Sequence, residues 1–352
     1  MRTLPDVVRF ALSAGASALA GRRVLYCLWE LTYRCNAKCS ICPYWRNPSD
    51  PDDELQLGDI KAGLDKLHAN GCRAVNFSGG EPTIRKDLED IVGHASDLGM
   101  WTSMVTNGSL LTRERLRRLR DAGLDNLLIS LDSLTPQVHD EHRGIKGLHA
   151  KVIQATRWLR DDFLKGHRTD GVMCVLTSLN LDEIDKVVRF ADDLGVYIVI
   201  QPYHDKKTGN SIFNAPIDAR LVEDLIRLRN ERRNLLCSDG YLRGLVTFAS
   251  GSNGPRCNAG RKYFSIDPYG YMHPCVDMPR AGHLLRDEWD AVASSQAMQG
   301  VQDCTGCWYA FRGESDASLS LRGCQDKLRL GLSVLARNRK RRRQLSGAAS
   351  EA

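Results

Sequence analysis

The sequence predicts an α/β fold in which six strand–helix units form a partial, TIM-like (β/α)6 barrel, followed by a small cysteine-rich extension. Three observations predict this fold. Apolar, strand-like runs alternate with helix-like segments between residues 24 and 203, which is typical of a parallel sheet. Glycines stand just past three expected helix ends, at Gly71, Gly99 and Gly123. Chemically distinctive residues follow the ends of successive strands, the edge at which closed barrels carry their sites.

The expected elements follow from this alternation in chain order. Apolar runs predict strands at 24–32, 74–78, 101–106, 126–131, 171–177 and 196–202. The segments between and after them predict helices at 58–69, 86–98, 112–122, 148–161, 181–194 and 217–232. Asp59, or alternatively Leu57-Gly58, and Thr112 stand where helix starts are expected. Beyond the barrel, a turn at 268–270 predicts a hairpin of two short strands, 264–267 and 271–274.

Composition limits the class of protein. The 352 residues can bury a sizeable core, and 42% hydrophobic with 26% charged residues is ordinary for a soluble globular enzyme. Six basic residues between 337 and 343 equal the whole net charge of +6, so the body is near neutral and no broad basic face for nucleic acid is expected. The clustering of the twelve cysteines favours metal in a reducing cytoplasm over disulfides.

Three cysteines directly follow the first expected strand, at Cys35, Cys39 and Cys42. Three thiolates within eight residues can hold one [4Fe–4S] cluster and leave its fourth iron open for a ligand that is not protein. The spacing alone also fits a zinc knot. The pattern therefore predicts a metal site but does not by itself decide the metal.

A second motif ends the second expected strand, Gly79-Gly80-Glu81-Pro82. The two glycines permit close approach of a ligand to the backbone because they have no Cβ, and Glu81 offers an acceptor for an ammonium group. Together the two motifs resemble the radical S-adenosylmethionine (SAM) superfamily. The resemblance implies a barrel in which the open iron is chelated by the amino and carboxylate groups of SAM.

The resemblance also implies the chemistry. A low-potential cluster passes one electron, supplied by a flavodoxin-type or ferredoxin-type donor, into SAM. Cleavage yields methionine and a 5′-deoxyadenosyl radical, which abstracts hydrogen from the substrate. Further expected cofactor contacts at the strand ends are Asn107, Ser130, Asp132 and Arg143. Asn107 fits a simple turn equally well, and Arg143 fits a solvated side chain.

One position departs from the family pattern, and another fits two roles. The family usually has an aromatic residue just before the third cysteine, where this chain has Ile41, so stacking on adenine is expected to be weaker. Tyr44 and Trp45 lie close enough in sequence to compensate. Asn180, just past the fifth strand, fits either a cofactor contact or a helix cap.

A second cysteine set follows the barrel, at Cys257, Cys275, Cys304 and Cys307. It resembles the twitch extension, the short form of the SPASM domain, which implies a fully ligated auxiliary [4Fe–4S] cluster that relays electrons. A tetrahedral zinc site with four cysteine ligands has the same spacing. Cys324 is a fifth candidate, either a ligand or a spare thiol.

Four domains are expected: an amphipathic N-terminal segment at 1–23, the barrel at 24–235, the auxiliary cluster domain at 236–326 and a basic helix and tail at 327–352. A cytoplasmic protein is expected, with no run of 18 apolar residues to span a membrane. Both termini combine apolar and basic residues, which fits peripheral contact with the inner membrane face. A helix packed on the barrel and a solvated tail are the alternatives.

The substrate is the least determined feature. With 34 residues before Cys35 and no diglycine at the C-terminus, elimination favours a small-molecule, sugar-type or lipid-linked substrate. The alternatives are maturation of a ribosomally made peptide, and an iron–sulfur redox or binding protein without catalysis. Candidate catalytic residues after the sixth strand are Tyr203, His204 and Asp205.

Overall fold

The computed structural model divides the chain into two compact units, each described here by itself. The first unit comprises residues 1–127, 141–145 and 256–304, and the second comprises 128–140, 146–255 and 305–352. The structure describes residues 25–338, except 48, 163–168, 252–256, 300, 302–303, 305, 318–324 and 327–328.

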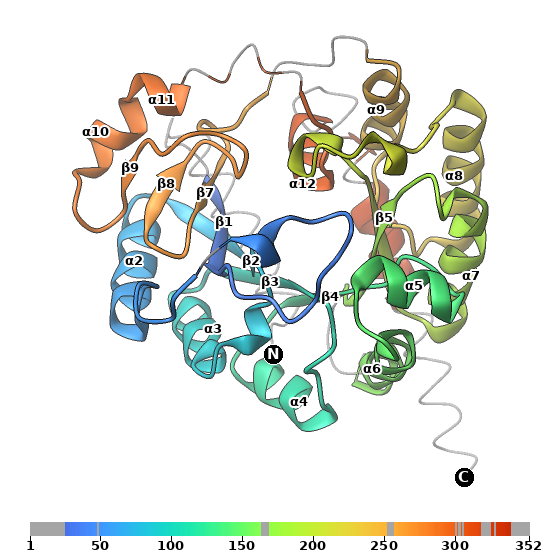
Figure 1. Ribbon diagram of the computed structural model, residues 1–352, viewed down its shortest axis with the longest axis horizontal. Helices are drawn as coiled ribbons and strands as arrows, with labels where there is room; N and C mark the ends of the chain where they lie inside the picture. The colour runs from blue at the N-terminus through green and yellow to red at the C-terminus, as the bar shows by residue number, and fades with distance from the viewer. Residues whose placement is uncertain are drawn as a thin grey trace. The chain divides into compact units, whose positions relative to one another are not determined.

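The first unit contains a sheet in the order β3-β2-β1-β7-β8-β9. Strands β1, β2, β3 and β7 run parallel, while β8 and β9 add as antiparallel strands. The strands are β1 (Leu25–Thr32), β2 (Cys72–Gly79), β3 (Trp101–Thr106), β7 (Tyr263–Ile266), β8 (Tyr271–His273) and β9 (Gly282–His283). The helices are α2 (Leu57–Ala69), α3 (Leu88–Asp97), α4 (Arg113–Asp121), α10 (Trp289–Ser294) and α11 (Gln296–Gln299), with short 3-10 turns η1 (Tyr44–Arg46) and η2 (Pro82–Ile84). Helices α2, α3 and α4 lie side by side along this sheet (Figure 1).

The second unit contains the parallel strands β6-β5-β4. These are β4 (Asn126–Ser130), β5 (Gly171–Leu176) and β6 (Tyr197–Pro202); along the chain, β4 and the helix α5 (Pro136–Arg143) cross from one unit into the other. The other helices are α6 (Leu148–Asp162), α7 (Ile184–Leu194), α8 (Ala219–Arg232), α9 (Asp239–Ala249) and α12 (Ala310–Ala317), with 3-10 turns η3 (Leu181–Glu183), η4 (Asp205–Lys207) and η5 (Ser211–Phe213).

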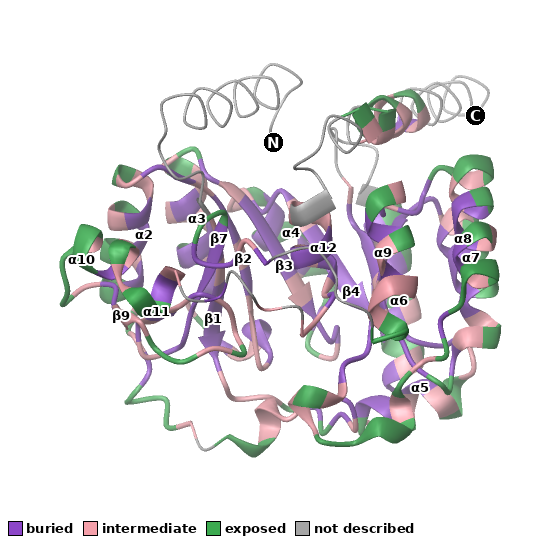
Figure 2. Ribbon diagram, turned by 90° about the horizontal axis from the view of Figure 1, so that it is seen from above, coloured by how far each residue is buried: buried purple, intermediate pink, exposed green. Residues whose placement is uncertain are grey.

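Helices cover the strands through apolar faces at helical spacing. In α7 the buried residues are Ile184, Val187, Val188 and Ala191, a single stripe at i, i+3, i+4 and i+7. Figure 2 shows buried residues along the strands and exposed residues on the outer sides of helices such as α8. Apolar burial of this kind is the main term that stabilises each unit.

A glycine permits a close helix–strand approach in the first unit. A Cβ on Gly63 of α2 would lie 2.6 Å from the ring of Trp29 in β1 and 2.7 Å from Leu284. Trp29 is fully buried, so the indole fills the space that a side chain at position 63 would need.

The structure bears out most expected elements and adds several. Thr112 caps α4, since its hydroxyl accepts a hydrogen bond of 3.1 Å from the Arg115 amide. The helix α2 begins at Leu57, the alternative start that the sequence offered, and Asp59 lies in its first turn. The expected hairpin is present as β7 and β8, but β7 also pairs with β1, which the sequence did not indicate. The helices α5, α9, α10, α11 and α12 were not predicted.

The expected terminal segments are only partly described. Residues 1–23 lie outside the described residues, and of the basic tail only 329–338 are described, as helix. Arg337 forms an ion pair with Asp192 and donates to the Arg232 carbonyl at 2.7 Å, while Tyr197 donates to Asn338 at 2.9 Å. This helix is therefore anchored on the second unit, which favours the packed-helix alternative for these residues.

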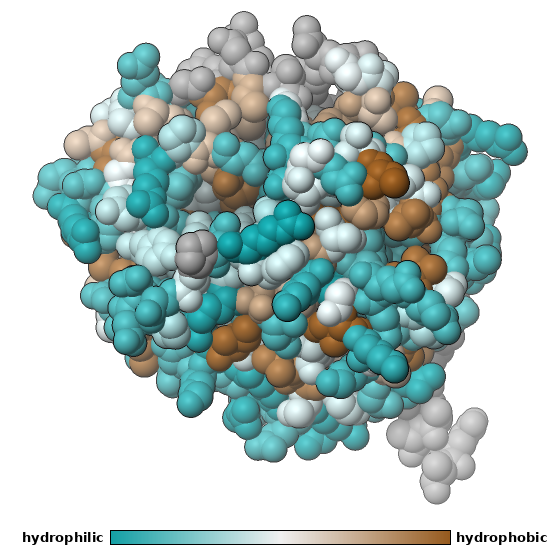
Figure 3. Space-filling model, viewed as in Figure 1, coloured by the Kyte–Doolittle hydropathy of each residue, from teal (hydrophilic) through white to brown (hydrophobic). Residues whose placement is uncertain are grey.

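No helix in the described part of the chain is both long and apolar enough to cross a membrane. Figure 3 shows hydrophilic side chains over much of the face it views, with separate apolar spots among them.

Candidate functional site

The segment that leads into Cys35 packs directly on the two glycines that end β2. The Gly80 amide donates to the Thr32 carbonyl at 2.7 Å. A Cβ on Gly79 would overlap the Thr32 carbonyl oxygen, and one on Gly80 would overlap the carbonyl of Arg34; Gly79 also has a positive φ of 112°. The glycines thus make room for the chain's own backbone, a reason that the sequence did not indicate.

The three thiols of the first motif share one electrostatic environment. Burial, together with nearby Glu81, Cys39 and Cys42, raises the pKa of the Cys35 thiol to about 12, although a hydrogen bond from the Ala37 amide acts in the opposite direction. Three thiols on one short loop suit a metal that binds thiolates, because metal binding displaces the thiol protons. Among the described residues, no three His, Cys, Asp or Glu side chains are already arranged to hold a metal ion, so both cysteine ligand sets stay predictions.

The segment 141–145 holds this loop through its backbone. The Ser40 amide donates to the His142 carbonyl at 3.1 Å, and the Cys39 thiol donates to the Arg143 carbonyl at 3.7 Å. A Cβ on Gly144 would lie 2.6 Å from the Lys38 carbonyl oxygen. Arg143 itself is buried, which rules out the solvated alternative for its side chain.

The carboxylate of Glu81 joins the ends of β2 and β3. It accepts hydrogen bonds from the Thr83 amide at 3.0 Å, the Thr83 hydroxyl at 2.5 Å, the Thr106 hydroxyl at 2.7 Å and the Asn107 amide at 2.7 Å. Glu81 is fully buried. A ligand ammonium would therefore have to share oxygens that protein donors already occupy.

Asn107 serves as a turn residue and as a link to the cysteine loop. Its side-chain oxygen accepts from the Ser109 amide at 2.8 Å, which is the turn alternative of the sequence. Its side-chain amide donates to Asn36 at 2.9 Å, and Asn36 donates to the Ser109 hydroxyl at 2.8 Å. The end of β3 is thereby tied to the residue after Cys35.

The aromatic residues after Cys42 are engaged within the first unit. Tyr44 stacks on Tyr33 with ring centroids 5.6 Å apart, and both hydroxyls donate to the buried carboxylate of Glu30. Trp45 donates from its indole to the Cys39 carbonyl at 3.1 Å. Tyr44 and Trp45 therefore support the loop around Ile41, which is itself buried.

A buried ion network, which sequence reasoning missed, supports the same loop. The Glu54 carboxylate accepts from Arg34 at 2.9 Å, from Thr32 at 2.5 Å and from Ser49 at 2.6 Å. Arg85 lies 3.8 Å from the same carboxylate. Burial raises the pKa of Glu54, but the hydrogen bonds from Arg34, Ser49 and Thr32 outweigh it, so the net pKa is lowered.

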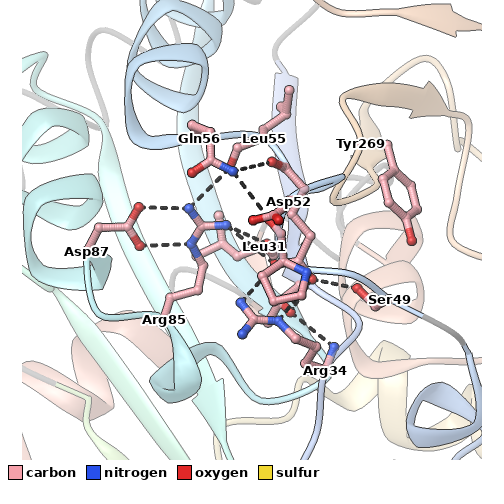
Figure 4. Close-up of polar contacts among 12 residues, drawn as sticks. Leu31, Arg34, Ser49, Asp52, Leu55, Gln56, Arg85, Asp87 and Tyr269 are labelled. Carbon is pink, nitrogen blue, oxygen red and sulfur yellow. Dashed lines mark hydrogen bonds and ion pairs between the residues drawn. The ribbon is translucent and has the colours of Figure 1, made fainter.

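Arg85 ties this network to the backbone of β1 (Figure 4). It donates to the Leu31 carbonyl at 3.3 Å and to the Leu55 carbonyl at 3.1 Å, and it pairs with Asp87 at 2.7 Å. The available sequence signal was a charged residue beside each motif, Arg34 before Cys35 and Arg85 after Pro82.

In the second unit, the predicted strand-end residues join β4 to β5. Asp132 is fully buried and accepts from the Val175 amide at 3.0 Å. The Asn180 side chain donates to the Asp132 carbonyl at 2.7 Å and accepts from the Thr177 amide at 2.8 Å, and it makes no cap hydrogen bond to η3. Ser130 is buried at the end of β4.

The candidate catalytic residues stabilise the loop after β6. Tyr203 donates to the Asn210 carbonyl at 2.9 Å. His204 accepts from the Lys206 amide at 3.1 Å through Nδ1 and contacts the Gly306 carbonyl through Nε2. Asp205 begins η4 and accepts from Asn214 at 3.0 Å. A catalytic role for these residues stays a prediction.

The second cysteine set is divided between the units. In the first, Cys257 lies 3.2 Å from the Tyr263 hydroxyl, Cys275 follows β8, and the Cys304 amide donates to the Val301 carbonyl at 3.0 Å. Cys307 belongs to the second unit, and Cys324 lies outside the described residues. The described cysteines form no disulfide.

Comparisons with known proteins agree with the family resemblance that the two motifs indicate. The model of the Radical SAM superfamily matches residues 29–191. A PqqA peptide cyclase from Rhodopseudomonas palustris is 30% identical over 80% of this chain and 78% of its own. An AdoMet-dependent heme synthase from Methanosarcina barkeri is 33% identical over 79% of this chain and 85% of its own.

Among solved structures, SuiB of Streptococcus suis bound to S-adenosylmethionine aligns with a TM-score of 0.65 at 18% identity, over 81% of this chain and 70% of that one. The similarity confirms the predicted α/β fold with a mostly parallel, partial-barrel sheet.

Proposed function

The chain belongs to the radical SAM superfamily, and from that premise we propose that it is a maturase that modifies a ribosomally made peptide. It is a radical SAM enzyme whose cofactors are SAM and [4Fe–4S] clusters. When bound, the first cluster and SAM supply a 5′-deoxyadenosyl radical that abstracts hydrogen from the substrate. The protein supplies binding, orientation and exclusion of water.

We assign the ligands of the first cluster to Cys35, Cys39 and Cys42. The observation that supports this assignment is the support built around their loop. Backbone bonds from 141–145, the Glu54 network and the packing on Gly79 and Gly80 all act on residues within or beside the loop. Such support holds ligands in a fixed orientation before a metal arrives.

We assign SAM contacts to the predicted strand-end residues of each unit and to Ile41. In the first unit these are Ile41, Gly79, Gly80, Glu81, Pro82, Asn107 and Arg143, and in the second unit Ser130 and Asp132. The fully bonded carboxylate of Glu81 suggests that its part is to fix the Thr106–Asn107 strand end rather than to act as a free acceptor.

We assign the auxiliary cluster to Cys257, Cys275, Cys304 and Cys307, with zinc as the alternative metal. The thiol of Cys257 is buried beside Tyr263, the first residue of β7, and Cys275 follows β8, the strand that pairs with β7. The proposed domain division keeps 24–235 as barrel and 236–326 as auxiliary domain, with the addition that β7 joins the strand β1.

The substrate class rests on the relatives. The match to a PqqA peptide cyclase, 30% identical over 80% of this chain, carries the peptide proposal. The expectation of a sugar-type or lipid-linked substrate has no support among these relatives, whereas the peptide alternative does. The heme synthase, at 33% identity, favours a second candidate, a tetrapyrrole substrate.

One experiment separates the two candidates. Anaerobically reconstituted protein would receive SAM and dithionite with either a synthetic copy of a short peptide encoded beside its gene or iron coproporphyrin III. We expect the peptide to stimulate 5′-deoxyadenosine formation and to lose the mass of two hydrogen atoms. Consumption of the tetrapyrrole without change in the peptide would transfer the assignment to the second candidate, and stimulation by neither probe would reject both.

A further inference from the structure

A buried arginine donates to the sulfur of one predicted auxiliary ligand. Nη1 of Arg312 lies 3.7 Å from Sγ of Cys307 and 2.5 Å from the carbonyl oxygen of the same residue. The Arg312 side chain is 2% exposed, so its charge is largely removed from water. All the residues involved belong to the second unit.

The position of this arginine is fixed by tight packing between α12 and α9. Trp308, the residue after Cys307, donates from its indole to the Tyr241 carbonyl at 2.9 Å and stacks on the Tyr241 ring at an interplanar angle of 8°. A Cβ on Gly244 of α9 would overlap the Trp308 ring, and one on Gly313 of α12 would overlap Tyr241. The absence of side chains at both glycines lets the two helices close around the indole.

The same packing orients the guanidinium. The Arg312 guanidinium carbon lies 5.7 Å from the centre of the Trp308 ring, within the range of a cation–π contact. Glu314, on the same helix, accepts from the Ser238 amide at 2.8 Å and so ties α12 to the start of α9. This packing holds the Arg312 guanidinium against the backbone and sulfur of Cys307.

A cation in this place has a definite physical effect on a thiolate. Charge-assisted hydrogen bonds are about twice as strong as neutral ones, and a buried site screens them little. The reduction potential of an iron–sulfur cluster depends on its net charge and on hydrogen bonds to its sulfurs. A positive donor at a ligand sulfur stabilises the more negative, reduced state and so raises the potential.

The geometry points to Arg312 as a positioning residue that orients Cys307 and raises the reduction potential of the auxiliary cluster. This inference rests on the proposed assignment of Cys307 as a cluster ligand. It adds that the readiness of this cluster to accept an electron is set by a residue of the chain itself, on the helix that follows the ligand.

The test uses the full chain with Cys35, Cys39 and Cys42 replaced by alanine, so that only the auxiliary cluster can be reconstituted. In that background Arg312→Gln, Arg312→Lys and the control Arg243→Gln would be titrated with dithionite and followed by EPR. Arg243 is an exposed arginine of α9 in the same unit, paired with Glu223. Iron content and circular dichroism would be measured on every variant.

We expect Arg312→Gln to keep its iron and to shift the midpoint potential to a more negative value, Arg312→Lys to shift it less, and Arg243→Gln to leave it unchanged. Equal potentials in all four proteins would overturn the inference while leaving the auxiliary cluster intact. If Arg312→Gln does not fold, Arg312→Lys decides alone, and an unchanged potential there overturns the inference. Zinc in place of iron in the background protein would overturn the auxiliary-cluster assignment, and this inference with it.

Discussion

Replacing Glu54 by alanine removes the acceptor at the centre of the network beneath the cysteine loop. The Glu54 side chain is 1% exposed and bonds to Arg34, Thr32 and Ser49. Its loss removes one of the two carboxylates near Arg85, whose side chain is 6% exposed, and leaves the ion pair with Asp87 in place. It also removes the carboxylate to which the Thr32 hydroxyl donates. Both changes act on the residues that lead into Cys35.

The expected cost follows from the burial of the pair. Removing one partner of a buried ion pair costs about 3–5 kcal/mol of unfolding free energy. Arg34 is 30% exposed and can rehydrate, which places the expectation at the lower end, about 3 kcal/mol. With a urea dependence of about 3 kcal/mol per molar, the unfolding midpoint falls by about 1 M.

The assay is urea unfolding of the cluster-free protein, followed by tryptophan fluorescence. The matched control is Glu114→Ala, which breaks an exposed i,i+4 pair with Arg118 and should cost only about 0.3–0.5 kcal/mol. A Glu54→Ala protein as stable as the Glu114→Ala protein would refute the reasoning that the buried network stabilises the loop. Reconstituted Glu54→Ala protein is also expected to hold less iron than the control.

Further predictions concern pH, the loop and the second cluster. The lowered pKa of Glu54 means that its carboxylate stabilises the fold above about pH 4.3, its ordinary value, and that this contribution disappears as pH falls through the folded pKa. Urea midpoints of wild type and Glu54→Gln should therefore converge on acidification, and a constant difference would contradict this assignment. Gly80→Ala should lower the free energy of unfolding by about 1–3 kcal/mol and reduce iron binding, because the new Cβ meets the backbone carbonyl of Arg34, which no rotamer change can move. A Gly80→Ala protein with the iron content of wild type would contradict this packing argument. Cys304→Ala should lower the iron count by about four per chain, and unchanged iron with lost zinc would identify a structural zinc site.

Local patterns in the sequence predicted the parts of the fold that depend on neighbouring residues. The alternation of strands and helices, the cap at Thr112 and the hairpin around Gly270 each depend on a few consecutive positions. Pairing between distant segments left no such signal. The strand β7 joins β1 because residues far apart in the chain meet in register, from Tyr26 with Tyr263 to Trp29 with Ile266.

The candidate site was likewise predictable only where its signal lies in local sequence patterns. The cysteines and the Gly-Gly-Glu-Pro motif were readable because their chemistry is carried by residue type and spacing. The Glu54 network was not, because Arg34, Glu54 and Arg85 look like ordinary surface charges until the fold buries them together. For the same reason the sequence indicated Glu81 as an acceptor but not the donors from Thr83, Thr106 and Asn107 that its carboxylate binds in the structure.

The central claim is that Cys35, Cys39 and Cys42 hold the cluster that cleaves SAM. The most direct measurement counts iron and 5′-deoxyadenosine in anaerobically reconstituted protein after addition of SAM and dithionite, in wild type, Cys39→Ala and Cys237→Ala, the last a buried cysteine outside both predicted sets. We expect about eight irons and deoxyadenosine in wild type and Cys237→Ala, and about four irons with no deoxyadenosine in Cys39→Ala. Deoxyadenosine formed by the Cys39→Ala protein would contradict the assignment of this cysteine as a ligand of the SAM-cleaving cluster.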